Sequence, residues 1–158
     1  MATSDNARSV VERWYTALAA GDIDGVVAGF HSDVMASVIG STPVSGRFEG
    51  RDAFLAGTLG VVFESLDPEQ IRFAKSWSIF AVDGPRVVGL MTGDAVAKNG
   101  RPYDSIYCQL FTIGDGQIVE YLEFVDTVVV EAALFDNPLT RPSEPQRAPM
   151  SITHLVER

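Results

Sequence analysis

Apolar residues recur at helical spacing near the start of the chain. The spacing of Ala7, Val11, Trp14 and Leu18 predicts an amphipathic helix that Ser4 or Asp5 can cap. Gly21 is a stop signal, and Asp22 can cap a second short helix that runs through Val26, Val27 and Phe30. The chain therefore opens with two helices.

The pattern then changes to that of strands. A strand is predicted over residues 34–39, followed by a loop through Gly46 and a helix over residues 51–63. Beyond Pro68 the chain alternates polar and apolar positions, and the glycine turns at 83–85, 98–100 and 114–116 separate four further strands. These strands cover residues 71–82, 86–97, 103–113 and 117–125, and a short helix is predicted over residues 126–135.

Helices that come first and antiparallel strands that follow favour an α+β domain, with the helices on one face of a curved sheet. A length of 158 residues favours one domain with a sizeable core. We place this domain at residues 1–136. Residues 137–158 contain four prolines among polar residues and read as an irregular tail.

The last hairpin carries an unusual mixture of side chains. Side chains alternate between the faces of a strand, so Tyr121, Glu123 and Val125 share one face. On the preceding strand, one face carries Ser105, Tyr107, Gln109 and Phe111. If the two faces coincide, a carboxylate lies among tyrosines, an amide and apolar walls. Such a mixture is typical of a pocket.

Composition and charge restrict the kinds of partner that the protein can bind. Hydrophobic residues make up 46% of the chain, and the formal net charge is −9. A chain this acidic, without a cluster of Lys and Arg, would be repelled by nucleic acid and by anionic membranes. Cys108 is the single cysteine, and no apolar run has the length of a signal peptide core or a membrane span, so we expect a cytoplasmic protein.

Motifs for cofactors are missing from the sequence. His31, His154 and Cys108 lack the spacing of a zinc site. There is also no phosphate-binding loop, dinucleotide fingerprint or nucleophile elbow. We therefore expect neither a metal nor a cofactor.

Two segments resemble a known superfamily. The opening VERWYTALAAGDIDGVVAGF, residues 11–30, and the hairpin segment GDGQIVE, residues 114–120, are similar to the nuclear-transport-factor-like proteins. That superfamily includes ketosteroid isomerases, limonene epoxide hydrolases and SnoaL-type polyketide cyclases, and the resemblance covers nearly all of residues 7–135. It implies a cone-shaped, strongly curved, mostly antiparallel sheet with the N-terminal helices over its concave face. It also implies a homodimer, because outer sheet faces in this superfamily commonly pair two chains.

The resemblance to ketosteroid isomerases does not carry their catalytic residues across. When the chains are anchored on Ala20-Gly21-Asp22, the tyrosine of the first helix falls on Trp14. The aspartate that moves the proton falls on Ser37 or Val38, and the aspartate of the oxyanion hole falls near Gln109. The same mechanism of steroid isomerisation is therefore disfavoured.

The resemblance to limonene epoxide hydrolases keeps the acidic residue. Glu123 lies over the catalytic aspartate of that family, and Asp94 over the acid of its Arg-x-Asp pair. The arginine of the pair is replaced by Thr92. SnoaL-type cyclases likewise use an acidic residue in an apolar cavity.

We therefore expect a cofactor-independent acid/base enzyme acting on a small hydrophobic molecule. Its catalytic residues would be Glu123, Gln109 and Asp94, with Asp94 as an acid opposite Glu123. SnoaL-like cyclisation or isomerisation ranks first and epoxide hydrolysis second, with a non-catalytic binding or dimerisation module as the rival. The residues expected to line the cavity are Tyr107, Tyr121, Trp14, Phe111, Ser105, Ser37 and Val125.

Overall fold

The computed structural model describes residues 3–139 and begins with two helices. Helix α1 spans Ser4–Ala20 and α2 spans Ile23–Ala28. The N-cap of α1 is Thr3, one residue before the predicted cap, and its side chain accepts a hydrogen bond from the Asn6 N–H. Gly21 ends α1 with φ +70°, a conformation that glycine adopts without strain. Asp22 caps α2, as predicted.

Six strands form one curved sheet. They are β1 (Phe30–Val38), β2 (Gly46–Glu49), β3 (Leu66–Asp83), β4 (Arg86–Ala97), β5 (Ser105–Gly114) and β6 (Gln117–Phe124). Their order across the sheet is β2-β1-β6-β5-β4-β3, and β1 with β6 is the one parallel pair. Strand β3 is irregular, with a register shift between Phe73 and Trp77 and a positive φ of 50° at Ala74. Such bulges bend a strand and help the sheet to curve.

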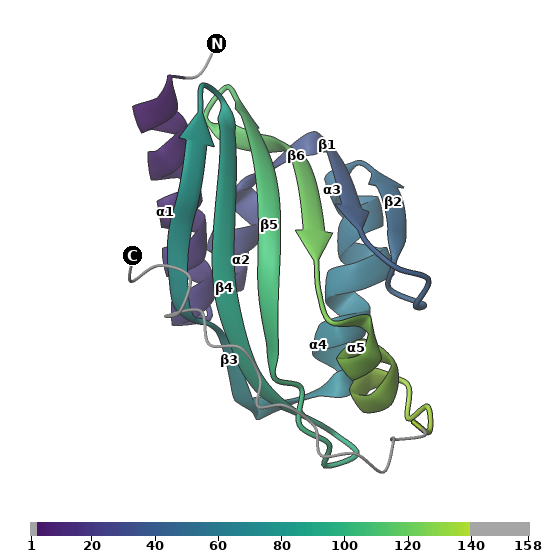
Figure 1. Ribbon diagram of the computed structural model, residues 1–158. Helices are drawn as coiled ribbons and strands as arrows, with labels where there is room; N and C mark the ends of the chain where they lie inside the picture. Colours follow the sequence, from purple (N-terminus) through teal and green to yellow (C-terminus); the bar gives the residue numbers. More distant parts are fainter. Residues whose placement is uncertain (1–2, 140–158) are drawn as a thin grey trace.

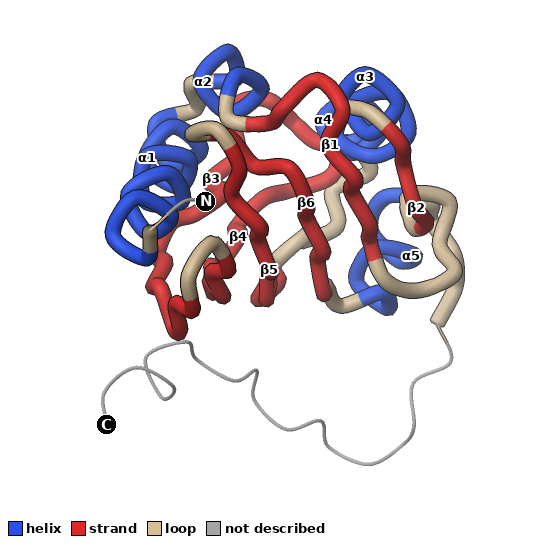
Figure 2. Tube along the Cα trace, turned by 90° about the horizontal axis from the view of Figure 1, so that it is seen from above, coloured by secondary structure: helices blue, strands red, loops and turns tan. Residues whose placement is uncertain are grey.

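The second helical segment lies over the other half of the sheet. It comprises α3 (Arg51–Phe54), a π-helical turn η1 (Leu55–Leu59) and α4 (Gly60–Ser65), where the sequence predicts one helix over residues 51–63. Figures 1 and 2 show α1 and α2 over one half of the concave face and α3 and α4 over the other. The outer face of β4, β5 and β6 carries no helix in either view. The predicted α+β cone is confirmed.

The short helix α5 (Thr127–Leu134) follows the sheet directly. Asp126 caps it by accepting hydrogen bonds from the N–H groups of Val128 and Val129, at 3.0 and 3.3 Å. The sequence predicts this cap. In Figure 1, α5 lies at the end of the sheet where β6 stops.

The register of the β5–β6 hairpin brings the two mixed faces together. Gln109 pairs with Glu123 and Phe111 pairs with Tyr121, so the two mixed faces coincide. Both faces point to the concave side, because Gln109, Phe111 and Tyr121 are buried. The turn uses positive φ at Asp115 and Gly116, as a tight hairpin requires.

Aromatic side chains form two separate groups inside the cone. The larger group joins the first helix to the hairpin, with contacts among Trp14, Tyr15, Phe30, Phe54, Phe111 and Tyr121. The smaller group lies toward the end covered by α4 and centres on Phe73, which packs edge-on against Phe63, Tyr103 and Tyr107. The polar residues of the hairpin lie between the two groups.

Strand β2 is an element that the sequence does not predict. The sequence predicts a loop through Gly46 and no element over residues 47–50, because so short a segment beginning with a glycine gives little periodicity; pairing with β1 makes it a strand. The predicted tail from residue 140 onward lies outside the described residues. No helix in the described part of the chain is long and apolar enough to cross a membrane.

Candidate active site

Glu123 points into the cone from the end of β6. Its neighbours in the sheet are Gln109 on β5 and Val38 on β1, and both of these residues are buried. The parallel pairing with β1 places an apolar wall on one side of the carboxylate, and the antiparallel pairing with β5 places an amide on the other. Glu123 thus occupies an inward position and not a surface one.

A chain of hydrogen bonds converges on this carboxylate. The Tyr15 hydroxyl donates to Gln109 Oε1 at 2.6 Å, and Gln109 Nε2 donates to the Tyr121 hydroxyl at 2.9 Å and to Glu123 Oε2 at 2.8 Å. The Tyr121 hydroxyl donates to the same Oε2 at 2.5 Å. Among the described residues none donates to Oε1, so this oxygen is the one available to a substrate.

Burial controls the charge of Glu123. Burial raises the pKa of its carboxyl above the ordinary value, and the hydrogen bonds from Tyr121 and Gln109 oppose that rise. The residue as a whole keeps some exposed surface, but its carboxylate lies deep among protein atoms. None of the ion pairs in the described part of the chain involves Glu123. A raised pKa without a cation suits a group that both takes and returns a proton.

All four tyrosines of the chain surround this carboxylate. Each is buried, and for each the pKa is raised first by burial and also by the negative charge of Glu123. For Tyr103 the pKa is raised to about 12. The four hydroxyls therefore stay protonated near neutral pH and act as neutral donors.

One of these hydroxyls has no protein partner. The Tyr107 hydroxyl is fully buried and makes no hydrogen bond within the described structure. The Tyr103 hydroxyl is near enough for each tyrosine to affect the pKa of the other, but the two do not meet the geometry of a hydrogen bond.

Two predicted site residues lie on the outer side of the sheet, and a third, Trp14, packs inside the larger aromatic group beside Tyr15 and Tyr121. Asp94 is on the outer side of β4, half exposed, and its carboxylate lies 2.6 Å from the Lys75 Nζ, which holds the pKa of Asp94 below its ordinary value. The expectation of an acid opposite Glu123 is wrong, because the inward positions of β4 are the odd ones. Ser37 has the opposite orientation to the buried Ala36 and Val38, so it also lies on the outer face. Trp14 belongs to the core, where its Nε1 donates to the Val26 carbonyl.

The remaining predicted lining residues lie on the inner side or at its edge. Phe111 and Tyr121 are buried in the larger aromatic group. Ser105 starts β5 on the same face as Tyr107, but its hydroxyl lies against backbone groups. Val125 is partly buried and packs against the core just beyond Glu123.

Tyr15 and Tyr103 are the residues that sequence reasoning missed. The comparison of the first helices placed the interior tyrosine position on Trp14, yet it is the next residue whose hydroxyl reaches Gln109. Both residues are buried, so helical spacing alone does not separate them. Tyr103 lies just before β5 and pairs its N–H with the Ala95 carbonyl, a contact that no sequence signal marks.

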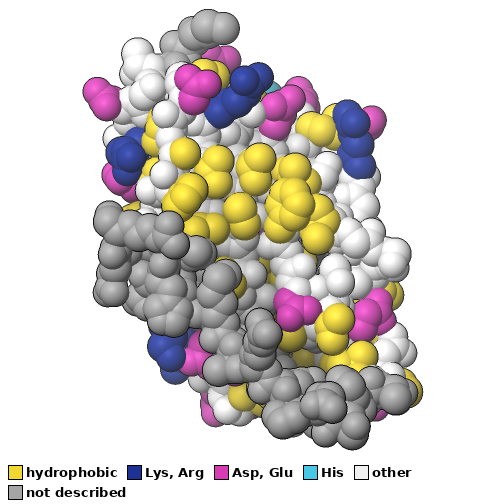
Figure 3. All heavy atoms as spheres, in the orientation of Figure 1, with side chains coloured by type: hydrophobic (Ala, Val, Ile, Leu, Met, Phe, Trp, Pro, Cys, Tyr) yellow, Lys and Arg dark blue, Asp and Glu magenta, His cyan; other side chains and the backbone are white. Residues whose placement is uncertain are grey.

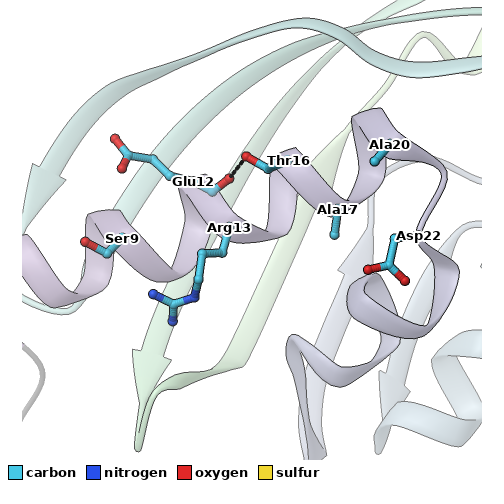
Figure 4. A pocket seen from close by; sticks show the side chains of 7 residues that line it. All are labelled: Ser9, Glu12, Arg13, Thr16, Ala17, Ala20 and Asp22. Atoms are coloured by element: carbon cyan, nitrogen blue, oxygen red, sulfur yellow. Dashed lines mark hydrogen bonds between the residues drawn. The ribbon is translucent and has the colours of Figure 1, made fainter.

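Two surface hollows lie away from this cluster. One, of about 470 Å³, runs along the solvent side of α1, opposite the side that carries Tyr15; Figure 4 shows its lining of Ser9, Glu12, Arg13, Thr16, Ala17, Ala20 and Asp22. The other, of about 480 Å³, lies by the turns around Pro85 and Asp115. Neither contains a residue of the hydrogen-bond chain. No group of three potential metal ligands occurs among residues 3–139.

The fold and the buried carboxylate together define a class: small α+β cones with a polar site inside a curved sheet. Residues 11–121 match the family model described as a SnoaL-like domain, and the chain belongs to this family. No curated protein matches the chain.

Solved structures agree with this assignment. An NTF2-like protein from Burkholderia thailandensis has 19% sequence identity and a TM-score of 0.71, covering 87% of this chain and 100% of the other. An NTF2-like protein of unknown function from Burkholderia pseudomallei has 23% identity and a TM-score of 0.69, covering 82% and 97%. A "putative polyketide cyclase" from Xanthomonas campestris pv. campestris has 23% identity and a TM-score of 0.67, covering 83% and 98%. At these identities the similarities establish the fold alone.

Proposed function

We propose that this protein is a cofactor-independent enzyme that moves a proton on a small, largely apolar molecule, in the manner of a SnoaL-like cyclase or isomerase. The observation that carries the proposal is the inward Glu123 carboxylate, buried without a cation and held through Oε2 while Oε1 is left open. A protein that only binds a ligand has no need to desolvate a carboxylate, which is costly.

The chemistry follows from the position of the free oxygen. Glu123 Oε1 takes a proton from a carbon next to a substrate carbonyl, and the electron pair of the broken C–H bond moves to the carbonyl oxygen as an enolate. Protonated Glu123 can return the proton to another carbon, which is isomerisation. Alternatively the enolate carbon attacks a second carbonyl carbon of the same molecule and closes a ring; the π electrons of that carbonyl move to its oxygen, which takes the proton from Glu123.

The surroundings favour a neutral substrate. Aromatic and aliphatic side chains line the concave side, and the chain carries a formal charge of −9. A second anion beside Glu123 would be repelled, and no cation among the described ion pairs is there to hold it. The name of the similar Xanthomonas structure, "putative polyketide cyclase", fits an oxygenated, mostly hydrocarbon substrate.

Epoxide hydrolysis is the weaker alternative. It needs a second group to protonate the epoxide oxygen, and the corresponding Thr92 and Asp94 are on the outer side of β4. The inward neighbours in that strand are Met91, Gly93 and Ala95, which cannot donate a proton.

Hydrogen exchange provides a direct test of the proposal. In D₂O the wild-type protein should accelerate loss of the C2 proton signals of 1-tetralone, an apolar cyclic ketone, as followed by NMR. Glu123→Gln should lower the rate by about 10²- to 10⁴-fold, the usual contribution of a general base.

The matched control is Glu120→Gln. Glu120 is on the same strand but exposed, and it accepts a hydrogen bond from Thr112 on the outer side. This variant should exchange at the wild-type rate. Equal rates in wild type and Glu123→Gln would remove proton transfer by Glu123 from consideration, and turnover of limonene oxide by the wild type would favour the epoxide alternative.

A further inference from the structure

The donors nearest Glu123 are already engaged. Gln109 uses its two N–H bonds on Tyr121 and Glu123, and its oxygen accepts from Tyr15. The Tyr121 hydroxyl donates its single proton to Glu123. These groups orient the base, so they are not free to donate to a substrate oxygen at the same time. An enolate still needs a donor, because charge develops on its oxygen.

Tyr107 is the donor that remains. Its hydroxyl is buried without a partner, which is unfavourable for the folded protein unless a ligand or water satisfies it. Tyr103 brings a second hydroxyl close to it, and both rings pack edge-on against Phe73, at centroid distances of 6.2 and 6.4 Å. The hydroxyls of Tyr107 and Tyr103 therefore make one polar site within the smaller aromatic group.

The pairing of β5 with β6 fixes the position of Tyr107 relative to Glu123. Tyr107 precedes Gln109 by two residues on the same face of β5, so it is the diagonal neighbour of Glu123 across the hairpin. Cβ atoms in that relation are about 7 Å apart. The two side chains therefore share one stretch of the concave face, where a single substrate can contact both.

The ring of Tyr107 packs against β4 at Gly93. A Cβ atom on Gly93 would lie 3.0 Å from Tyr107 Cε2 and 3.1 Å from Phe73 Cδ1, so the absence of a side chain there lets both rings rest on β4. On the other side Phe73 contacts Phe63 of α4, which is only partly buried.

We propose that Tyr107, with Tyr103 beside it, donates the hydrogen bond that stabilises the enolate oxygen formed when Glu123 removes the proton. This inference rests on the proposed function for its chemistry. The C–H bond breaks toward Glu123 Oε1, the electron pair moves to the oxygen, and the Tyr107 O–H remains intact as a donor throughout. The structure thus divides the tyrosines: Tyr15 and Tyr121 position the base, while Tyr107 and Tyr103 bind the substrate oxygen.

Tyr107→Phe separates these roles in the exchange assay. Its kcat for 1-tetralone should fall about 10²-fold, as for loss of one oxyanion donor, with a smaller change in KM. The pH midpoint of the rate should stay at the wild-type value, because Tyr107 does not bond Glu123. Tyr15→Phe is the contrast, since loss of its bond to Gln109 should move that midpoint.

Stability provides a control against a purely structural role. The midpoint of urea unfolding of Tyr107→Phe should equal or exceed that of the wild type, because the hydroxyl has no protein partner to lose. A lower midpoint together with a proportional loss of rate would overturn the proposal. So would a wild-type kcat in Tyr107→Phe.

A binding measurement keeps the inference testable if the wild type exchanges no protons. By calorimetry, 2-naphthol should bind the wild type and Glu123→Gln, and Tyr107→Phe should bind it about tenfold more weakly, the value of one hydrogen bond. Unchanged affinity in Tyr107→Phe, or no binding to the wild type, would overturn the assignment of Tyr107. If the wild type exchanges no protons but binds 2-naphthol more tightly than Tyr107→Phe does, the result contradicts the proposed function alone.

Discussion

At the scale of single residues, Glu123 combines two opposing influences. Burial destabilises its charged form, and two hydrogen bonds to Oε2 stabilise it. The net effect raises the pKa above the ordinary value of 4.5, so the folded protein holds this proton more tightly than the unfolded chain does. The free energy of unfolding therefore falls as the pH rises above about 4.5, and stops falling above the pKa of the folded state.

This linkage predicts how Glu123→Gln changes stability. The variant has no group to ionise, so its free energy of unfolding should exceed that of the wild type by more at pH 8 than at pH 4. Urea unfolding of both proteins at the two pH values measures this difference, with Glu120→Gln as the exposed control. A difference that shrinks toward pH 8 would mean that the folded state favours the ionised carboxylate.

Sequence reasoning reached Glu123, Gln109 and Tyr121 because strand alternation fixes which side chains share a face. It failed at Asp94, where similarity to another family was carried across without knowing the register of β4. A shift of one residue moves a side chain to the opposite face, and the local sequence Thr92-Gly93-Asp94 does not indicate which side chain faces inward. It also missed Tyr15, because its partner Gln109 lies 94 residues away in the chain.

At the scale of elements, the contact of α1 with β4 sets the position of Tyr15. The Tyr15 ring lies directly over Gly89, where a Cβ atom would be 2.2 Å from the Tyr15 hydroxyl oxygen and 2.8 Å from Cε2. The glycine is therefore required by the close approach of the helix. Spacing patterns predict both elements but cannot predict which residue of one touches which residue of the other.

Gly89→Ala should consequently displace Tyr15 from Gln109. We expect a loss of about 1–3 kcal/mol in the free energy of unfolding, the usual cost of overpacking a core. A double-mutant cycle with Tyr15→Leu checks the cause, because removing the ring should relieve most of that loss. If the effects of Gly89→Ala and Tyr15→Leu on the free energy of unfolding are additive, the strain comes from a contact other than that with Tyr15.

At the scale of the whole molecule, the outer face of the sheet carries a band of apolar side chains. Two rows of paired residues cross β4, β5 and β6: Val88, Leu110 and Leu122 in one, and Leu90, Cys108 and Phe124 in the next, of which Leu90 is buried. Figure 3 shows hydrophobic side chains gathered on this face, with charged ones near its upper edge. Leu110 and Phe124 are among the exposed large apolar residues. Contiguous apolar surface of this kind is typical of an interface.

We therefore predict a homodimer that pairs this face with its copy. Sedimentation equilibrium should give twice the chain mass of 17.1 kDa for the wild type and the single mass for Leu110→Lys. Ile23→Lys is the matched control, since Ile23 is an exposed apolar residue on α2, away from the sheet. A monomeric wild type, or equal effects of both substitutions, would contradict the prediction.

The hairpin of β5 and β6 has a consequence for how such a protein can diversify. The proposed base and its amide partner lie only 14 residues apart, on two strands joined by a tight turn. One short stretch of sequence therefore carries the base and its amide partner, while α3, η1 and α4 supply much of the surrounding wall from a different stretch. Substitutions in those helices can reshape the space offered to a substrate without altering the hairpin. Directed evolution of new substrates should accordingly find its productive changes between residues 51 and 65.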